Sequence, residues 1–196
     1  MVILYDIDPG ASERLASDLG GIEPGGARVA VAETPADAVP ESDVVILASW
    51  YGANLDTATM LGAELAGKVV VDISNPLNAR FDGLVTSPET SAAETIRDVL
   101  PKTVRVVKAF NTTFAGTLLA GNVAGQTLDV FIAGDDAAAR NTVASFVRDG
   151  GLNPIDVGPL ERARQLEAIG FLGITLQAHL GTHFNTAWKL VMPAKR

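Results

Sequence analysis

The chain has 196 residues, a formal net charge of −8 and 47% hydrophobic residues, which suits a protein with one well-filled core. The acidic balance argues against nucleic acid or an anionic membrane as a partner, since both favour clustered Lys and Arg. The absence of cysteine excludes disulfides, thiolate metal sites and a cysteine nucleophile and is consistent with a reducing compartment. With no secretion signal and no apolar run of membrane length in the sequence, we expect a soluble cytoplasmic protein whose partners are small molecules.

Short runs rich in Val and Ile alternate along the chain with Ala-rich stretches. The runs are almost entirely apolar, which is typical of parallel strands buried on both faces. Regular alternation of such strands with helices predicts an α/β fold with a doubly wound, mostly parallel sheet. The predicted strands are residues 2–7, 28–32, 43–48, 68–73, 103–109 and 129–133, with a short piece near 154–157.

Helix starts are indicated by capping residues. Thr34 precedes a proline and an acid, Ser91 and Glu94 form a capping box, and Asp135 or Asp136 is placed to cap a helix that ends near residue 148. Further helices are expected over residues 11–19 and 55–65, and the Ser91 helix is expected to end near residue 100. After residue 159 no strand signal remains, and the apolar spacing predicts one long helix in a C-terminal segment, residues 160–196, which covers a ligand or forms a homodimer contact.

Polar and aromatic residues follow four of the predicted strands. In open parallel sheets, ligands bind outside the carboxyl ends of the strands, so these residues are candidates for a site. Each has an ordinary structural explanation as a turn, a cap or a packing aromatic, but their convergence on one sheet edge favours a ligand site. The four groups are Asp6-Ile7-Asp8, Ser49-Trp50-Tyr51, Ser74-Asn75-Pro76 and Phe110-Asn111-Thr112.

An acid at the end of the second strand of a dinucleotide-binding fold binds the adenosine ribose, about 20 residues after a glycine-rich phosphate loop. Asp6 or Asp8 suits that role, but no such loop precedes them in this sequence. The glycine pairs at 20–21 and 25–26 are not a substitute, because they follow a predicted helix and precede a strand. A Gly-Lys-Ser/Thr phosphate loop is also missing from the sequence, which argues against a nucleoside triphosphatase.

Five segments taken together resemble the NADPH-dependent reductases of the deazaflavin coenzyme F420, whose dinucleotide-binding domain is shared with the cytoplasmic domains of some metalloreductases. They are residues 69–77, 90–94, 106–112, 133–136 and 156–160. The resemblance implies that residues 1–159 form a Rossmann-like NAD(P)-binding domain. It further implies hydride transfer between NADP or NAD and a flat acceptor such as F420 or a flavin.

The resemblance also implies which residues border the two rings. Neither a catalytic side chain nor a metal ligand is implied, because positioning of the rings supplies the catalysis. Ser49 stands where the family usually has a proline. Residues implied beside the nicotinamide half are Ser49, Trp50 and Tyr51; those implied to border the nicotinamide and the acceptor are Asn75, Pro76, Ala109, Phe110 and Asn111.

Two departures from the family pattern affect the dinucleotide. Asp6-Ile7-Asp8 replaces a Ser-Arg type pair, and because a carboxylate repels a 2′-phosphate, this favours NAD(H), although Arg14 is near enough in sequence to assist NADP(H). The chain also starts at the family's second strand, without the central first strand and its glycine-rich loop. The remaining strands then pair directly, or another chain supplies an edge, or the native product is longer; we favour the last and expect weak dinucleotide binding by the 196-residue form.

His179 and His183 share a helix face, but two histidines without a third ligand do not predict a metal site. We expect them to line the acceptor pocket or to pack at a subunit contact. The alternative to an enzyme is a non-catalytic dinucleotide-binding or regulatory protein of the same fold.

Overall fold

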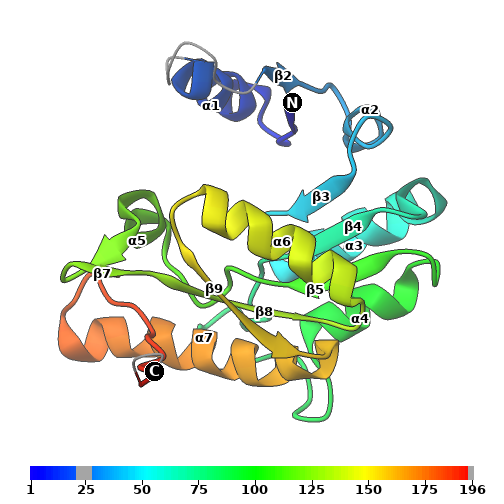
Figure 1. Cartoon of the computed structure of the whole chain (residues 1–196). Coiled ribbons are helices and arrows are strands. Elements are labelled where there is room, and N and C mark those ends of the chain that lie inside the picture. The colour runs from blue at the N-terminus through cyan, green and yellow to red at the C-terminus, as the bar shows by residue number, and fades with distance from the viewer. Residues whose placement is uncertain (21–27, 194–196) are drawn as a thin grey trace.

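A computed structural model describes residues 1–20 and 28–193 of the chain (Figure 1). The strands are β1 (Val2–Leu4), β2 (Val29–Val31), β3 (Val44–Leu47), β4 (Val69–Asp72), β5 (Arg105–Lys108), β6 (Asn122–Val123), β7 (Gln126–Thr127), β8 (Asp129–Gly134) and β9 (Asn153–Gly158). The helices are α1 (Pro9–Gly20), α2 (Pro35–Ala38), α3 (Tyr51–Leu61), α4 (Ala92–Val99), α5 (Ala115–Ala120), α6 (Ala137–Asp149) and α7 (Ala163–Leu180), with 3-10 turns η1 (Gly62–Leu65) and η2 (Leu160–Arg162).

The main sheet has five strands in the order β3-β4-β5-β8-β9. Every neighbouring pair is parallel except β5 and β8, which are antiparallel. The expected α/β architecture with a mostly parallel, Rossmann-like sheet and a C-terminal helix is therefore confirmed. Because β3, β4 and β5 run in the same direction, their carboxyl ends lie at one edge of the sheet.

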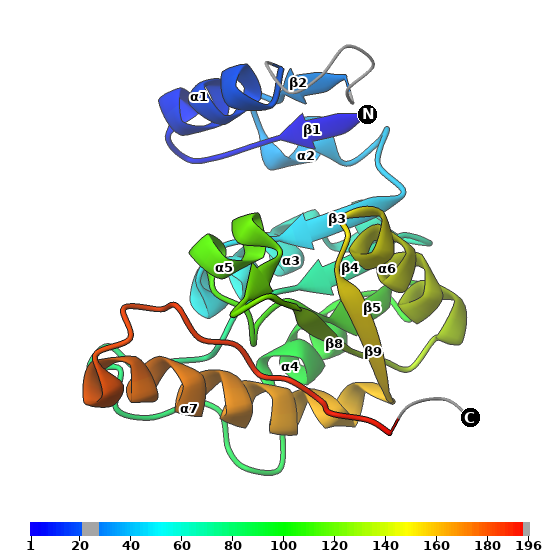
Figure 2. The same ribbon diagram turned by 60° about the vertical axis from the view of Figure 1, so that its left-hand side comes forward.

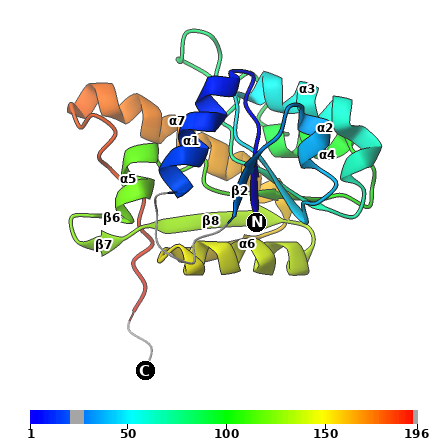
Figure 3. The same ribbon diagram turned by 90° about the horizontal axis from the view of Figure 1, so that it is seen from above.

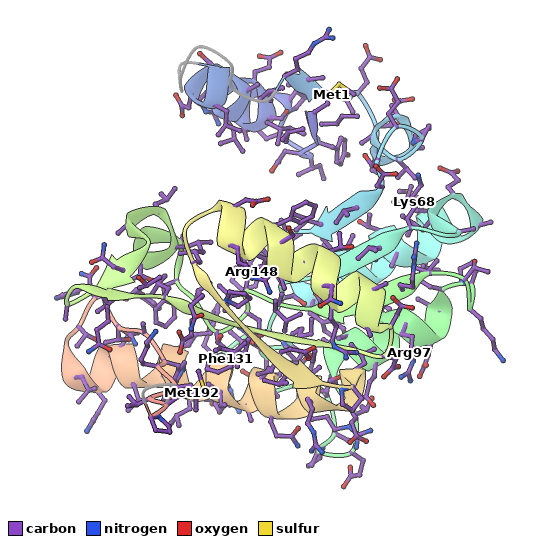
Figure 4. All side chains as sticks on the ribbon, viewed as in Figure 1. Met1, Lys68, Arg97, Phe131, Arg148 and Met192 are labelled. Atoms are coloured by element: carbon purple, nitrogen blue, oxygen red, sulfur yellow. The ribbon has the colours of Figure 1, made fainter. Side chains whose placement is uncertain are left out.

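Helices cover both faces of the main sheet, with α6 on one face and α3, α4 and α7 on the other (Figures 1 and 2). Alternate residues of each central strand enter opposite cores, as the pleat requires. Val70 and Val106 belong to the core that includes Ile96 of α4, whereas Val71 and Val107 belong to the core that α6 completes. Side chains fill the layers on both sides of the sheet (Figure 4), so the central strands form a rigid platform for their end loops.

The N-terminal elements form a separate layer. β1 pairs with β2 in a parallel two-stranded sheet with α1 beside it, apart from the main sheet (Figures 1 and 2). Seen from above, this layer lies over the main sheet (Figure 3). Among the described residues β1 and β3 belong to different sheets, so the alternative in which the remaining strands pair directly is wrong. Val2 and Ile46 on these two strands are 39% and 52% exposed, in contrast to the buried valines of β4.

The predicted N-caps are confirmed, but the Ser91–Glu94 capping box forms in one direction only. Ser91 Oγ accepts from the Glu94 amide at 3.1 Å, whereas the Glu94 carboxylate accepts from the Ser91 hydroxyl at 2.8 Å and not from its backbone amide. Thr34 accepts a hydrogen bond from the Asp37 amide at 3.2 Å, and the Asp37 carboxylate accepts from the Thr34 amide at 3.1 Å. Asp136, not Asp135, caps α6 by accepting from the Ala139 amide at 2.7 Å. The glycine pairs at 20–21 and 25–26 lie mostly outside the described residues, apart from Gly20 at the end of α1.

The first strand is shorter than predicted, because the acids that follow it bond to their own backbone. Asp6 accepts from the Asp8 amide at 2.8 Å, and Asp8 accepts from the Gly10 amide at 3.0 Å. These Asx turns end the strand at Leu4 and start α1 at Pro9. The short helix α5 and the β6–β7 hairpin were not predicted.

Candidate functional site

Two adjoining pockets lie at the carboxyl ends of β3, β4 and β5. The first has a volume of about 350 Å³ and is lined by Ala48, Ser49, Trp50, Ile73, Ser74, Asn75, Leu77 and Ile174. The second has a volume of about 420 Å³ and shares Trp50, Ile73, Asn75, Leu77 and Ile174 with the first. Its remaining lining residues are Phe81, Phe110, Asn111, Thr113, Phe114, Ala115, Leu118 and Phe184.

We name the first pocket the strand-end pocket and the second the aromatic pocket. The strand-end pocket takes its hydroxyl and amide groups from Ser49, Ser74 and Asn75. The aromatic pocket is walled by rings in edge-to-face pairs: Trp50 and Phe81 have centroids 5.9 Å apart, and Phe114 and Phe184 have centroids 5.2 Å apart. Edge-to-face aromatic walls offer apolar area and ring faces, so this pocket suits a flat aromatic ligand.

The loop after β5 is turned into the pocket by an uncommon backbone conformation. Phe110 has a φ of 62°. The backbone amide of Asn111 donates to the backbone carbonyl of Ala109 at 2.8 Å, which closes a turn centred on Phe110. A three-residue turn with positive φ at its centre is strained for an aromatic residue. Such strain persists where the surroundings hold it, commonly at functional sites.

Two asparagines fasten the loops after β4 and β5 to each other. The side-chain Nδ2 of Asn75 donates to the backbone carbonyl of Asn111 at 2.8 Å. The side-chain Nδ2 of Asn111 donates to Asn75 Oδ1 at 2.9 Å. Asn111 also donates to the Leu166 carbonyl of α7 at 2.9 Å. Its Oδ1 is buried without a hydrogen-bond partner among the described residues. Both asparagines line the aromatic pocket, so this bracket fixes part of its wall.

A fully buried charge cluster lies beneath these loops, at the ends of β4 and β5. Lys108 Nζ is 2.7 Å from Asp72 Oδ2 and 2.9 Å from Glu167 Oε1 of α7, and it donates to the Ser74 carbonyl at 2.5 Å. All three ammonium hydrogens therefore have acceptors. The Glu167 carboxylate also accepts from the Ala92 amide at 3.0 Å, at the start of α4. We name Lys108, Asp72 and Glu167 the buried triad.

Asp72 extends this network to the loop after β3. Its Oδ1 accepts from the Ser74 amide at 3.0 Å and from the Asn54 amide nitrogen at 3.2 Å. Asn54 in turn accepts from the Ser49 amide at 3.1 Å. The two loops that line the strand-end pocket, after β3 and after β4, are thus connected through buried polar groups.

Burial and charge act in opposite directions on the pKa values of the triad. Burial alone would lower the pKa of Lys108, but the carboxylates of Asp72 and Glu167 outweigh it and raise that pKa above its ordinary value. Burial raises the pKa of Glu167, although the Lys108 charge opposes this. Lys108 is therefore held as a cation that binds both carboxylates.

The predicted site residues divide into three groups. Ser49, Trp50, Asn75, Phe110 and Asn111 line the two pockets, whereas Tyr51, Pro76 and Ala109 adjoin lining residues in the chain without lining either pocket. Ala109 is wholly buried in the core on the α6 side. Asp6, Ile7 and Asp8 follow β1 in the N-terminal layer and line neither pocket.

Sequence reasoning missed the buried triad and the rings that come from elsewhere in the chain. Asp72 and Lys108 each end a run of valines, and a charge at that place in an otherwise apolar strand is a signal that could have identified the pair. Glu167 and Phe184 lie in the C-terminal segment, and no local pattern predicts which strand end they reach.

Among residues 1–20 and 28–193 there is no group of three or more His, Asp or Glu side chains suited to a metal ion. Within the same part of the chain, no helix is long and apolar enough to cross a membrane.

Comparison with known proteins gives consistent results. The profile of the family described as "NADP oxidoreductase coenzyme F420-dependent" matches residues 1–76. The F420-dependent NADP reductase of Methanocaldococcus jannaschii is 36% identical over 140 residues, covering 68% of this chain and 61% of the reductase. The metalloreductase STEAP3 of Rattus norvegicus is 35% identical over 133 residues, covering 68% of this chain and 26% of the metalloreductase.

The chain thus spans about three fifths of the archaeal reductase and a quarter of the metalloreductase. Among solved structures, a protein from Arthrobacter sp. FB24 described as a candidate F420-dependent NADP-reductase superposes with a TM-score of 0.80. It is 31% identical, and the alignment covers 97% of this chain and 88% of that one. On the fold, the identity and this coverage, the chain belongs to the family of F420-dependent NADP oxidoreductases.

Proposed function

We propose that this protein is a nicotinamide-dependent oxidoreductase that transfers a hydride between NADP(H) and a flat acceptor such as the deazaflavin F420 or a flavin. The observation that supports this most strongly is the pair of adjoining pockets, one lined with polar strand-end groups and the other with aromatic rings. Hydride transfer requires two rings within about 3.5 Å of each other, and two pockets that share five lining residues are adjacent enough to hold two rings side by side.

The strand-end pocket fits the nicotinamide end of a dinucleotide. Ser49 and Ser74 supply hydroxyl groups and Asn75 supplies an amide at the place where such ligands bind in parallel sheets. Trp50 is 67% exposed and lines both pockets, and aromatic side chains commonly line ligand pockets. A bound dinucleotide would supply the hydride, and the residues named here would orient it.

The aromatic pocket fits the acceptor. Phe110, Phe114 and Phe184 offer apolar contacts that exclude water from the space between the rings. The hydride step needs neither a protein acid nor a protein base, so we assign these side chains to binding and orientation. The family name supports NADP(H) and F420 as the pair; Asp6, Asp8 and Arg14 are the residues we propose for the choice between NADP(H) and NAD(H).

The decisive experiment measures oxidation of NADPH and of NADH at 340 nm with F420, a flavin and a ferric chelate as acceptors. We expect turnover with one of the two planar acceptors. Phe114→Ala should raise the KM for that acceptor, whereas Phe146→Ala, on α6 away from both pockets and 47% exposed, should not. Dinucleotide binding without turnover of any acceptor would support the non-catalytic alternative.

A further inference from the structure

Helix α7 meets the sheet edge through a single face. Leu166 accepts a hydrogen bond from Asn111 at 2.9 Å, and Glu167 forms the ion pair with Lys108 at 2.9 Å. One turn further, Gly170 approaches Asn75 so closely that a Cβ there would lie 2.5 Å from Asn75 Oδ1. Positions three and four apart share a helix face, so these contacts together fix the helix against the loops after β4 and β5.

The next turn of the same face reaches the ligand pockets. Ile174 is four residues beyond Gly170 and lines both the strand-end pocket and the aromatic pocket. It is the α7 side chain that the two pockets share. Any shift of α7 along its axis, relative to the sheet edge, would therefore move Ile174 relative to both ligands.

A buried ion pair suits the fixing of a helix position better than apolar contacts do. Apolar burial is non-directional and tolerates small shifts, whereas the hydrogen bonds of an ammonium group depend steeply on distance and angle. Lys108 and Glu167 are 0% and 1% exposed at their side chains, so water cannot replace a lost partner. A shift of α7 would leave charges unpaired in the core, which is costly.

We propose that Lys108 and Glu167 are positioning residues for hydride transfer: their ion pair holds α7 in one position on the sheet edge and so places Ile174 where the two rings meet. This inference rests on the proposed function. Neither residue touches a pocket, and both act through Ile174.

The test compares Glu167→Gln with Glu161→Gln, the same chemical change on an exposed residue of η2. In the native protein one Glu167 oxygen contacts Lys108 and the other accepts from the Ala92 amide. A glutamine has a single acceptor oxygen, so one of these two contacts is lost. Because misplacement of about 1 Å can reduce a rate by up to about 100-fold, we expect kcat to fall at least about tenfold in E167Q. The dissociation constant of NADPH should change by less than about twofold, since seven of the eight residues that line the strand-end pocket come from the loops after β3 and β4 and only Ile174 comes from α7. E161Q should match the unaltered protein.

A double-mutant cycle separates positioning from general damage. If Glu167 acts through Ile174, adding E167Q to Ile174→Ala should reduce kcat little further, whereas independent effects would multiply. A lower melting temperature in E167Q with kcat unchanged would overturn the proposal. If E167Q does not fold, Glu167→Asp keeps the charge but shortens the side chain that reaches Lys108, and an unchanged kcat in that variant would overturn the proposal equally.

Failure of the proposed function gives a different result. If the unaltered chain oxidises NADPH with none of the three acceptors at saturating NADPH, the proposed function fails, and amide hydrogen exchange then tests the positioning alone. Faster exchange over residues 168–178 in E167Q, but not in E161Q, would support the role of the ion pair. Equal exchange in the two variants would refute it.

Discussion

Replacing Gly170 by alanine has two opposite effects on the stability of this protein, one from helix preference and one from packing. In an open helix position the change stabilises by up to about 1 kcal/mol, because glycine loses more backbone entropy on folding. At Gly170 the added Cβ would lie 2.5 Å from Asn75 Oδ1 and 3.0 Å from the Asn111 carbonyl oxygen. Either α7 must retreat from the sheet edge or the Asn75 side chain must turn away.

Both responses cost more than the helix gains. Overpacking a core contact costs about 1–3 kcal/mol. Turning Asn75 away breaks its bonds of 2.8 and 2.9 Å with Asn111, at about 1 kcal/mol each, with a further penalty for groups left unpaired. We therefore expect G170A to lose about 2 kcal/mol net of the gain in helix preference, which for a chain of this length lowers the melting temperature by about 4–8 °C.

Urea unfolding followed by circular dichroism measures this directly, with Gly52→Ala as the matched control. Gly52 lies in α3 and a Cβ there would meet nothing within 4 Å, so G52A should be unchanged or stabilised by at most about 1 kcal/mol. A G170A protein as stable as the unaltered one would show that α7 does not press on Asn75, and the reasoning about the α7 face would fail with it.

Three further results are expected. Asn111→Asp replaces an amide that donates to two oxygens with a carboxylate, so it should destabilise the protein by about 3 kcal/mol in thermal unfolding at neutral pH and by less in acid. Burial alone would raise the pKa of Glu94, but hydrogen bonds led by the one from Arg164 hold that pKa below its ordinary value. The ionised carboxylate therefore stabilises the fold at neutral pH, and this stability is lost as the pH falls below the ordinary pKa. Glu94→Gln should flatten the acid limb of a curve of unfolding free energy against pH. Asp8 pairs with Arg14 at 3.4 Å on an exposed surface, and Asp8→Asn should raise the affinity for NADPH relative to NADH in a fluorescence titration, because it removes a negative charge and frees the arginine. An unchanged ratio of the two affinities would exclude Asp8 from that choice.

The centre of the main sheet was predictable because β4, β5 and β8 are largely buried on both faces. A run such as 69–71 consists of valines alone, and a parallel strand between two helix layers gives every residue of such a run a buried place. The residues at which strands and helices begin and end were less predictable. Asp6 and Asp8 look like the end of a longer strand, but their carboxylates bond to the backbone and end it early.

The β6–β7 hairpin was missed for a related reason. Its turn residues, Ala124 and Gly125, have φ values of 51° and 74°, and the usual signal for such a turn is Asn-Gly or Asp-Gly. Alanine rarely adopts a positive φ, so the local sequence does not predict this turn. Pairing of Asn122 with Thr127 and the contacts around the hairpin decide the conformation instead.

The candidate site was partly predictable by the same logic. Ser49, Asn75 and Asn111 follow strands whose ends share an edge, so the topology of a parallel sheet brings them together. The contribution of α7 follows no such rule, because Ile174 and Glu167 reach the edge only through tertiary packing. The charge pair of Asp72 and Lys108 depends on register, since these two residues are direct partners across β4 and β5.

The two pockets share five lining residues, but the residues that distinguish them come from different parts of the chain, and this bears on how specificity is divided. The family profile matches residues 1–76, which include Ser49, Ser74 and Asn75 of the strand-end pocket. The rings that distinguish the aromatic pocket come mostly from residues 110–118 and from Phe184. Substitutions of Phe114, Leu118 or Phe184, which lie beyond the strand ends, change the shape offered to an acceptor without altering those ends. We therefore expect differences in acceptor among proteins of this architecture to follow that segment and Phe184, while the dinucleotide contacts follow the strand ends.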